Sequence, residues 1–315
     1  MPPTNRPADT QAEKNPADSR RPSPPAQGSD PVGAAIWMIG SIASFCWMAI
    51  GARELAGKIN TFEVLFLRSA IGLVIVSAVI VHQRKIHLFR TKRPKLHLLR
   101  NVFHFAGQYG WFIAIGVLPL AQVFALEFTT PLWTLLIAAV VLKETLTLRK
   151  SGAILLGFFG TALILDPGQE LISRDALSML AAAICFSLAY VCMKSLASSE
   201  NPLTILFYMF IMQLPVALLL SLQSMTMPSL SQWGWITLIG ITALSGHFCI
   251  ANAISKAEAS VVVTLDFLRL PLIIGVGVVL YAESFNLMLL AGAICMLLAN
   301  LINLSAPKSP LRSER

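Results

Sequence analysis

Long apolar runs separated by short polar breaks fill most of the chain from residue 32 onward. A helix that crosses the hydrocarbon core of a bilayer needs about 20 predominantly apolar residues. The breaks at 118–121 and 252–259 are very short, but joining the runs across them would make segments too long for one span. We therefore expect an all-α membrane protein with ten transmembrane helices. Their expected positions are 32–52, 62–81, 101–118, 121–142, 151–166, 176–194, 203–223, 232–252, 259–281 and 286–305.

The composition supports a surface that faces lipid. Hydrophobic residues make up 56% of the 315 residues and charged residues only 13%, whereas a soluble domain carries about 25% charged residues. Residues 1–31 differ, because they are rich in Pro, Ser, Ala and charge and contain no apolar run. Such a segment cannot bury enough surface to offset the entropy of ordering. We expect a disordered cytoplasmic tail at 1–31 and a cytoplasmic C-terminal tail at 306–315.

The distribution of basic residues predicts the orientation. The net charge is +8, but Lys and Arg gather beside the expected spans, above all at 82–100. Short cytoplasmic loops of membrane proteins are enriched in these residues. With both termini in the cytoplasm, nineteen Lys and Arg lie on that side and three on the other. We therefore interpret the basic residues as a signal that fixes the membrane topology, and we expect no nucleic-acid partner. The five cysteines lie in apolar runs without metal-ligand spacing, so we expect no metal and no cofactor.

A weak internal repeat relates the two parts of the chain. At a constant offset of 139, AQVFALEFTTPLWTLLIAAVVLKET from residue 121 aligns with SVVVTLDFLRLPLIIGVGVVLYAES from residue 260, so that Glu127 falls on Asp266. The repeat predicts two five-helix halves, 32–166 and 176–305. Because five is odd, the second half enters the membrane with the opposite orientation. Inverted repeats of this kind are typical of secondary transporters, which bind substrate near the midplane between the halves.

Four ordered motifs point to one family. They are FEVLFLR ending at Arg68, GVLPLAQ at 116–122, Pro131 with Glu144, and the segment from Ala259-Ser260 to Glu283. In this order the chain resembles the drug/metabolite transporter superfamily, specifically bacterial EamA-domain proteins, over residues 33–304. The resemblance implies ten helices in the bacterial cytoplasmic (inner) membrane, both termini in the cytoplasm, a central cavity, and transport of small metabolites such as amino acids or vitamins. Arg269 departs from the general pattern of the family.

Ionisable side chains inside expected spans are costly in lipid and are read as functional by default. Arg68 and Glu127 each lie six residues from the outer face, or about 9 Å deep, and this equal depth predicts an Arg68–Glu127 ion pair. Asp266 and Arg269 are three residues apart and are expected to neutralise each other toward the inner half. The two acids would then guard opposite ends of one pathway. Each pair either stabilises helix packing or opens to accept a charged group or a proton.

Polar residues on the third span form a second set of candidates. His104, Gln108 and Trp111 recur at i, i+4 and i+7, which places them on one helical face. An imidazole, an amide and an indole on one face favour a cavity that binds a polar, partly planar metabolite. The alternative is interhelical hydrogen bonding, which is common for His and Gln in membrane bundles. His247 and Gln213 are weaker candidates for the same cavity.

Prolines are expected to break two of the spans. Pro131 and Pro271 lie within the fourth and ninth spans, where proline removes a backbone donor and clashes with the preceding turn. Unwound backbone at membrane depth can then face a cavity. Glu144 and Glu283 lie near the ends of the same spans, and we expect them to have structural roles.

Together these features favour a secondary transporter, either an exporter or an uptake carrier, that moves a small polar metabolite by alternating access. Proton coupling is left open, as is the choice between a monomer and a homodimer. A membrane channel or a membrane-embedded enzyme is the alternative. An enzyme needs a metal cluster, a nucleophile with its base or a larger extramembrane domain, and a channel more often forms its pore through oligomeric symmetry. The sequence has no P-loop signature, so direct drive by ATP is not expected.

Overall fold

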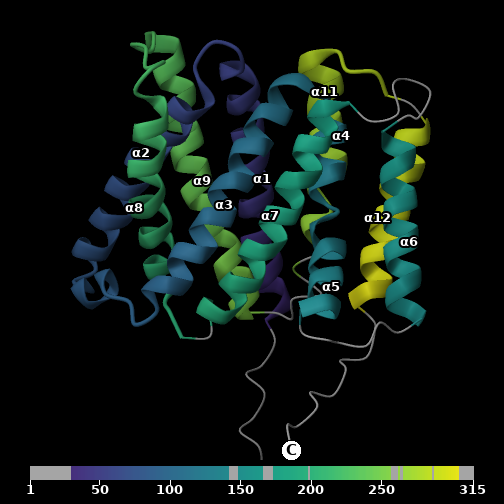
Figure 1. Ribbon diagram of the computed structural model, residues 1–315, viewed down its shortest axis with the longest axis horizontal. Helices are drawn as coiled ribbons and strands as arrows, with labels where there is room; N and C mark the ends of the chain where they lie inside the picture. The colour runs from purple at the N-terminus through teal and green to yellow at the C-terminus, as the bar shows by residue number, and fades with distance from the viewer. Residues whose placement is uncertain are drawn as a thin grey trace, which may run out of the picture.

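The computed structural model describes residues 30–141, 148–165, 173–197, 199–256, 262, 265–285 and 287–304. All regular secondary structure in these ranges is helical (Figure 1). The α-helices are α1 (Pro31–Leu55), α2 (Thr61–His82), α3 (Pro94–Val117), α4 (Leu120–Glu127), α5 (Thr130–Val141), α6 (Leu148–Ile164), α7 (Arg174–Ala197), α8 (Pro202–Ser221), α9 (Leu230–Lys256), α11 (Arg269–Tyr281) and α12 (Leu287–Leu304); a 3-10 helix, η2 (Ile86–Phe89), follows α2. Glu144 and all but two residues of the expected tails lie outside the described ranges.

Each of the ten expected spans contains a described helix, and the chain is an all-α membrane protein. By length and composition, six stretches can each cross a membrane: α1, α2, α4 with α5, α7, α8 and α9. Helices α11 and α12 are shorter apolar helices. Helix α3 is 24 residues long but carries buried His, Arg, Asn and Gln side chains. Its apolar character is therefore weaker, although its length is sufficient to span.

The direction of the helices relates the two halves. Helix α1 begins and α12 ends on the same side of the bundle, the lower edge of Figure 1, which we name the terminal side. Helices α4 and α5 are two parts of one crossing, so the chain from α1 to α6 crosses five times. Helix α7 consequently enters from the side opposite to α1. The second half, α7 to α12, is inverted relative to the first.

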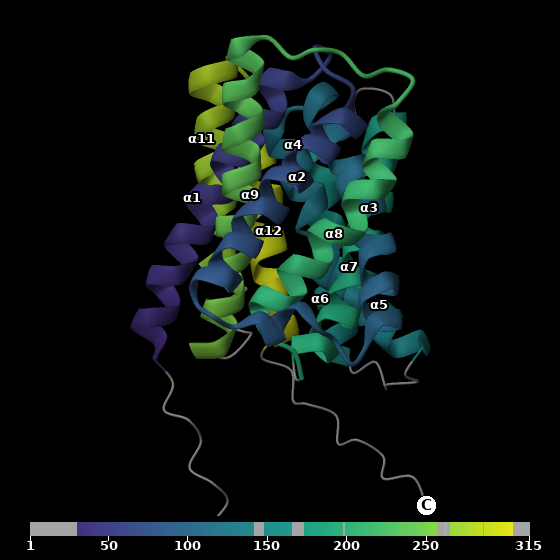
Figure 2. The same ribbon diagram turned by 90° about the vertical axis from the view of Figure 1, so that its left-hand side faces the viewer.

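The halves pack into each other in a symmetric pattern (Figures 1 and 2). The first helix of each half packs against the third helix of the other, α1 against α9 and α7 against α3. The second helices pair as α2 with α8, and the last helices pair as α6 with α12. These last two pairs lie at opposite ends of the bundle in Figure 1. The polar faces of α2, α3, α8 and α9 are thereby brought together in the interior.

Two glycines at the repeat offset permit close approach in the α3–α7 and α1–α9 pairs. A Cβ atom on Gly107 of α3 would lie 2.8 Å from the ring of Phe186 on α7. A Cβ atom on Gly246 of α9 would lie 3.1 Å from the ring of Phe45 on α1. Gly107 and Gly246 are 139 residues apart, which is the offset of the sequence repeat. The same aromatic-on-glycine contact therefore fixes the α3–α7 and α1–α9 pairs.

The fourth crossing is interrupted in its middle. Helix α4 ends at Glu127 and α5 begins at Thr130, so Pro131 is the second residue of a new helix. A proline there removes no helical hydrogen bond, because the first amides of a helix have no partner within it. The hydroxyl of Thr130 donates to the Glu127 carbonyl at 2.5 Å, and that of Thr129 donates to the Leu126 carbonyl at 2.6 Å. These bonds satisfy carbonyl groups that hydrocarbon would leave unpaired.

The ninth crossing is interrupted in a similar way. A turn at Phe267 and Leu268 precedes α11, and Pro271 is the third residue of that helix. The Phe267 ring stacks on that of Phe128, 4.5 Å between centroids, so the two breaks lie against each other. Glu127 and Asp266, the last residues before the two turns, are placed side by side in the bundle interior.

Candidate substrate site

Among the residues that the structure describes, three arginine side chains are buried inside the bundle. Arg68 on α2, Arg100 on α3 and Arg269 at the start of α11 are 1%, 2% and 5% exposed. A buried cation in a membrane protein requires compensation by charge or hydrogen bonds. The three arginines meet this requirement in two different ways.

Arg269 is compensated by two carboxylates. Its Nη2 atom lies 3.1 Å from Glu127 Oε1 and 2.9 Å from Asp266 Oδ2. The other oxygen of Glu127 accepts a hydrogen bond from Trp111 Nε1 at 2.7 Å. We name Glu127, Asp266 and Arg269 the acid cluster. Its members come from both halves, so the cluster joins the fourth and ninth crossings. The guanidinium carbon of Arg269 also lies within 5.0, 5.2 and 5.1 Å of the ring centroids of Phe45, Phe124 and Phe128.

The acid cluster corrects two expectations from the sequence. The expected Arg68–Glu127 pair is wrong, because both oxygens of Glu127 are bonded, one to Arg269 and one to Trp111. An equal depth does not bring Arg68 and Glu127 together, because the two side chains lie on helices with different neighbours. Helix α2 packs mainly on α8 and α9, whereas α4 packs mainly on α7 and α11. Asp266 does pair with Arg269, three residues away. However, Asp266 and Glu127 meet at one arginine and do not lie at opposite ends of a pathway.

Arg68 is held by amides. With the Gln108 amide oriented to satisfy its neighbours, its oxygen accepts from both terminal nitrogens of Arg68, at 2.8 and 2.6 Å. The Gln108 nitrogen then donates to Gln213 Oε1 at 2.9 Å. Gln213 Nε2 in turn donates to Asn101 Oδ1 at 3.4 Å, and this oxygen also accepts from Arg100 Nη1 at 2.9 Å. We name these five residues the arginine–amide network. It connects α2 and α3 of the first half with α8 of the second.

Two histidines lie between the network and the acid cluster. His104 Nδ1 lies 3.0 Å from Gln213 Nε2, and its ring lies 5.4 Å from the ring of His247 on α9. The His247 ring meets Phe45 edge-on at 5.3 Å, and Phe45 covers Arg269. The structure thus brings all eight residues proposed from the sequence for substrate or coupling into one continuous interior region. His247 and Gln213, which the sequence ranked as weaker, are central to it.

Sequence reasoning missed two members of this region, Arg100 and Asn101. The sequence pattern groups Arg100 with the basic residues of the preceding loop and puts Asn101 at the start of a span. A usable signal was present, because Arg100, His104 and Gln108 are spaced by four residues and share one helical face. Helix α3 begins at Pro94, which puts Arg100 almost two turns inside the helix.

On the side opposite the termini, a partly buried ion pair joins the halves. Arg53 lies at the end of α1 and Glu283 lies shortly after the end of α11. The Nη2 atom of Arg53 is 2.8 Å from Oε1 of Glu283. Glu283 also accepts the backbone N–H of Leu120 at the start of α4, and Arg53 donates to the Leu118 carbonyl at 2.6 Å. A carboxylate at a helix start satisfies free amides and the positive end of the helix dipole. We name this set the opposite mouth. Glu283 has a packing role in it.

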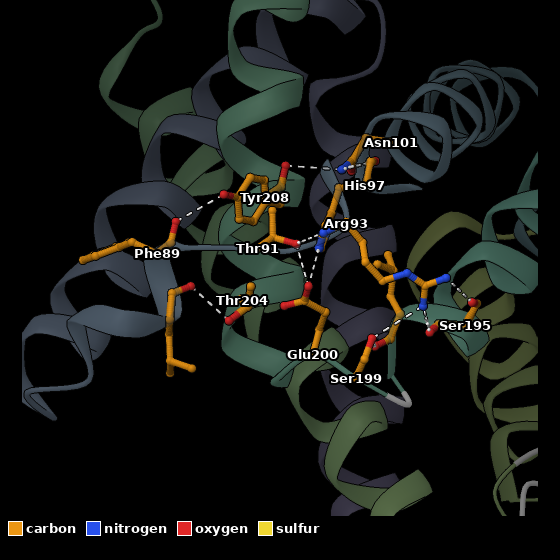
Figure 3. A network of polar contacts seen from close by, with 12 residues as sticks. Phe89, Thr91, Arg93, His97, Asn101, Ser195, Ser199, Glu200, Thr204 and Tyr208 are labelled. Carbon is orange, nitrogen blue, oxygen red and sulfur yellow. Dashed lines mark hydrogen bonds and ion pairs between the residues drawn. The ribbon is translucent and has the colours of Figure 1, made fainter. Parts of the chain in front are cut away.

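On the terminal side, a second network joins the halves (Figure 3). Thr91, before α3, donates to Glu200 Oε1 at 2.5 Å. Arg93 donates to the carbonyl of Ser195 at the end of α7 at 2.7 Å and to its hydroxyl at 2.9 Å. His97 is fully buried, and its Nε2 lies 4.0 Å from Glu200 Oε1. We name this set the terminal mouth.

A further contact on the terminal side joins α1 to α9. Lys256 Nζ lies 2.9 Å from Asp30 Oδ2. The backbone N–H of Gly33 and the Lys256 ammonium hold the pKa of the Asp30 carboxyl below its ordinary value. Within the described residues, no group of three His, Cys, Asp or Glu side chains is arranged to hold a metal ion.

Comparison with known proteins identifies transporters that are similar to this chain over most of its length. The S-adenosylmethionine uptake transporter of Rickettsia prowazekii is 23% identical over 278 residues, covering 88% of this chain and 94% of the relative. The riboflavin transporter of Vibrio cholerae is 29% identical over 248 residues, covering 77% and 83%. The pseudopaline exporter CntI of Pseudomonas aeruginosa is 25% identical over 266 residues, covering 83% and 93%.

A solved crystal structure shows the same fold. It is 17% identical to this chain, superposes with a TM-score of 0.63, and covers 87% of this chain and 96% of its own. The sequence profile of the EamA-like transporter family matches residues 32–166 and again residues 174–305, once in each inverted half. The chain therefore belongs to the EamA-like transporter family.

Proposed function

We propose that the protein is a secondary transporter that carries a small polar metabolite across the bacterial cytoplasmic membrane by alternating access. The observation that carries this proposal is the arginine–amide network. Arg68 is buried in the bundle, its terminal nitrogens bond a neutral amide, and its Nε is buried without a partner. A guanidinium in this state gains most from an anionic group that replaces the amide. The network spans both halves, where inverted-repeat transporters bind substrate.

The relatives support a small polar substrate. Their names describe carriage of S-adenosylmethionine, riboflavin and pseudopaline, and they include both uptake and export. The proposal therefore covers transport in either direction, and the gradient that drives transport sets the direction. In the site, Trp111 and the two histidines supply an indole and imidazole rings beside the charged groups. Such a mixture of flat and polar side chains is typical of pockets for small metabolites.

The two mouths supply the elements of alternating access. The opposite mouth joins α1 and α4 of the first half to the residue that follows α11 in the second. The terminal mouth joins the start of α3 to the end of α7. Both are closed here, so substrate entry requires one of them to separate. Opening one mouth while the other holds is a rocking motion of one half against the other. The excess of basic residues assigns the terminal side to the cytoplasm.

The acid cluster is the proposed coupling site. Asp266 Oδ1 is buried without a hydrogen-bond partner, although Oδ2 is paired with Arg269. A carboxylate oxygen left in this state can accept a proton or a cationic group of the substrate. Proton coupling would appear as transport of substrate driven by an imposed pH gradient alone.

The test begins with ligand discovery on the purified full-length protein. A panel of amino acids, vitamins and nucleosides is screened by thermal stability, where a ligand at 100 times its Kd adds about 2.7 kcal/mol. Compounds that stabilise the protein are then followed in proteoliposomes. We expect saturable flux and exchange for at least one of them, and loss of both stabilisation and flux in Arg68→Gln.

Lys58→Gln is the matched control, because Lys58 is an exposed cation beside the opposite mouth. Its flux should equal that of the wild type. Flux that rises linearly with concentration and shows no exchange would mean that the protein is a channel. Full flux in a folded Arg68→Gln variant would remove Arg68 from the site.

A further inference from the structure

The interior charges are distributed unequally between the two clusters. Arg269 faces two carboxylates in the acid cluster. Arg68 and Arg100 are connected through three amide side chains, and no carboxylate lies within ion-pair distance of either among the residues that the structure describes. The arginine–amide network therefore carries two positive charges that the described part of the protein does not neutralise.

Resting on the transport function proposed above, we propose that Arg68 and Arg100 form one anion-recognition site, and that the transported metabolite carries two acidic groups, each a carboxylate or a phosphate. One acidic group pairs with Arg68 and the other with Arg100. The amides of Gln108 and Asn101 occupy those positions in the empty protein.

Burial separates Arg100 from the ordinary basic residues of the terminal side. A basic residue that only sets topology extends its charged end to water or lipid headgroups. Arg100 is 2% exposed, and its Nε atom is buried without a partner. By contrast Arg93, two turns earlier, bonds to Ser195 and closes the terminal mouth. Arg100 is thus an interior cation, and its described bonding partner is the Asn101 amide.

The amides are suited to a temporary role. An amide oxygen accepts a hydrogen bond from arginine but contributes no charge, so its bond is weaker than that of a carboxylate. Arginine presents a planar fork that matches carboxylate and phosphate with two parallel hydrogen bonds. Exchange of amide for acid therefore strengthens the contact and also neutralises a buried charge. A metabolite with one acidic group achieves this at one arginine and leaves the other unneutralised.

The spacing of Arg100 and Gln108 along α3 bears on the length of the diacid. Arg100 and Gln108, the partner of Arg68, are eight residues apart on α3, or about 12 Å along the helix axis. His104 lies on the same face between them. Hydrogen bonds through Gln108, Gln213 and Asn101 link the two guanidinium groups, so a diacid that replaces these amides contacts both. The two arginines then form a single site, which extends along the face of α3 beside the amides that link them.

Binding of matched probes to the purified full-length protein tests this inference. The probes are glutarate against pentanoate and glutamate against glutamine, each pair differing by one acidic group, at constant ionic strength. We expect the two-acid member of each pair to bind at least tenfold more tightly, measured by calorimetry and thermal stabilisation. In Arg100→Gln this preference should disappear, while the affinity for the one-acid members changes less than twofold. Arg68→Gln should abolish binding of all four.

Lys95→Gln controls for general attraction of anions, because Lys95 is an exposed cation on the first turn of the same helix. It should keep the tenfold preference. If Arg100→Gln does not fold, Arg100→Lys keeps the charge without the planar fork, and its preference should fall several-fold without vanishing. Equal binding of one-acid and two-acid probes, no binding of the two-acid probes, or an unchanged preference in a folded Arg100 variant overturns the inference.

These outcomes separate the inference from the transport proposal. Saturable flux of a neutral or one-acid compound that depends on Arg68 but not on Arg100 leaves the transporter in place and removes the second acidic group. Flux without saturation for every compound removes the transporter itself. The probes report equilibrium binding, so they give an answer about Arg100 whichever result the flux measurement returns.

Discussion

At the scale of single residues, the interior charges differ in how they are neutralised, and this difference separates packing from recognition. Arg269 forms ion pairs with both halves and is covered by three aromatic rings. Arg68 and Arg100 are held by amides alone among the described residues. Removal of a partner of Arg269 would leave a buried charge unpaired, whereas an anion bound at Arg68 or Arg100 would neutralise one.

The first prediction concerns Arg269. Arg269→Met leaves Glu127 and Asp266 buried and unpaired, and removal of one partner from a buried pair costs about 3–5 kcal/mol. We expect a large fall in the thermal unfolding temperature in detergent. The triple variant with Glu127→Gln and Asp266→Asn should recover most of that loss, because no uncompensated charge remains. Equal instability of the single and triple variants would show that the acid cluster does not act through charge pairing.

At the scale of helices, two features set the arrangement of the bundle: the helix breaks at the fourth and ninth crossings, and the glycines at the helix contacts. Helix α4 ends before a proline that starts α5, and threonine hydroxyls satisfy the carbonyls left at the break. This places Glu127 at a helix end in the interior. Gly107 and Gly246 let aromatic rings from α7 and α1 lie directly on the backbones of α3 and α9. Both features position the residues of the candidate site.

The second prediction concerns Gly107. Its added Cβ in Gly107→Ala would meet the Phe186 ring at 2.8 Å and the Ala182 carbonyl at 3.2 Å. Overpacking of this kind costs about 1–3 kcal/mol. Gly234→Ala on α9 is the control, because nothing lies within 4 Å of its added Cβ, and alanine should there be neutral or stabilising by up to about 1 kcal/mol. The thermal unfolding temperatures of both variants in detergent test this prediction. Equal stability of Gly107→Ala and Gly234→Ala would mean that α3 and α7 do not pack so closely.

At the scale of the whole molecule, the inverted halves produce two mouths of different construction. The opposite mouth is built on an ion pair and a helix start, and the terminal mouth on hydrogen bonds that join Glu200 to Thr91 and Arg93 to Ser195. Each mouth bonds one half to the other. In the rocking motion proposed above, one of these sets breaks at a time, so we expect their relative strengths to set which side the empty protein favours.

The third prediction follows from the charge of the opposite mouth. Arg53→Gln removes the ion pair with Glu283 and should shift the protein toward opening on that side. In a background without the five native cysteines, Leu118→Cys should then react at least fivefold faster with a membrane-impermeant thiol reagent. Arg174→Gln, an exposed arginine at the start of α7, should leave the rate unchanged. An unchanged rate in Arg53→Gln as well would show that this ion pair does not hold the mouth closed.

The fourth prediction concerns orientation. The sequence count of nineteen Lys and Arg in the expected cytoplasmic segments against three in the expected outside loops predicts that the terminal side faces the cytoplasm. A reporter that is active only in the periplasm, fused after Arg315, should give no signal, while the same reporter placed after Lys58 should be active. A strong signal from the Arg315 fusion would contradict the topology.

Much of the fold follows from the sequence, because lipid imposes one requirement on every span. Each crossing needs a similar length of apolar residues, and each of the ten expected positions contains a described helix. The polar face of α3 and the acids at the repeat positions were also visible as exceptions to an apolar pattern. Arg100 was missed because its position beside a basic loop resembles a topology signal, and only its burial distinguishes the two.

Which interior charges meet was decided by the tertiary structure. Depth in the membrane can be read from the sequence, but the rotation of each helix and its choice of neighbours depend on packing of whole faces. Arg68 and Glu127 share a depth, yet Arg68 faces Gln108 and Glu127 faces Arg269. The breaks before Pro131 and Pro271 bring the two acids to one arginine. The sequence by itself determined where the charged groups lie along the membrane normal, and the packing of the two halves determined which of them are neutralised.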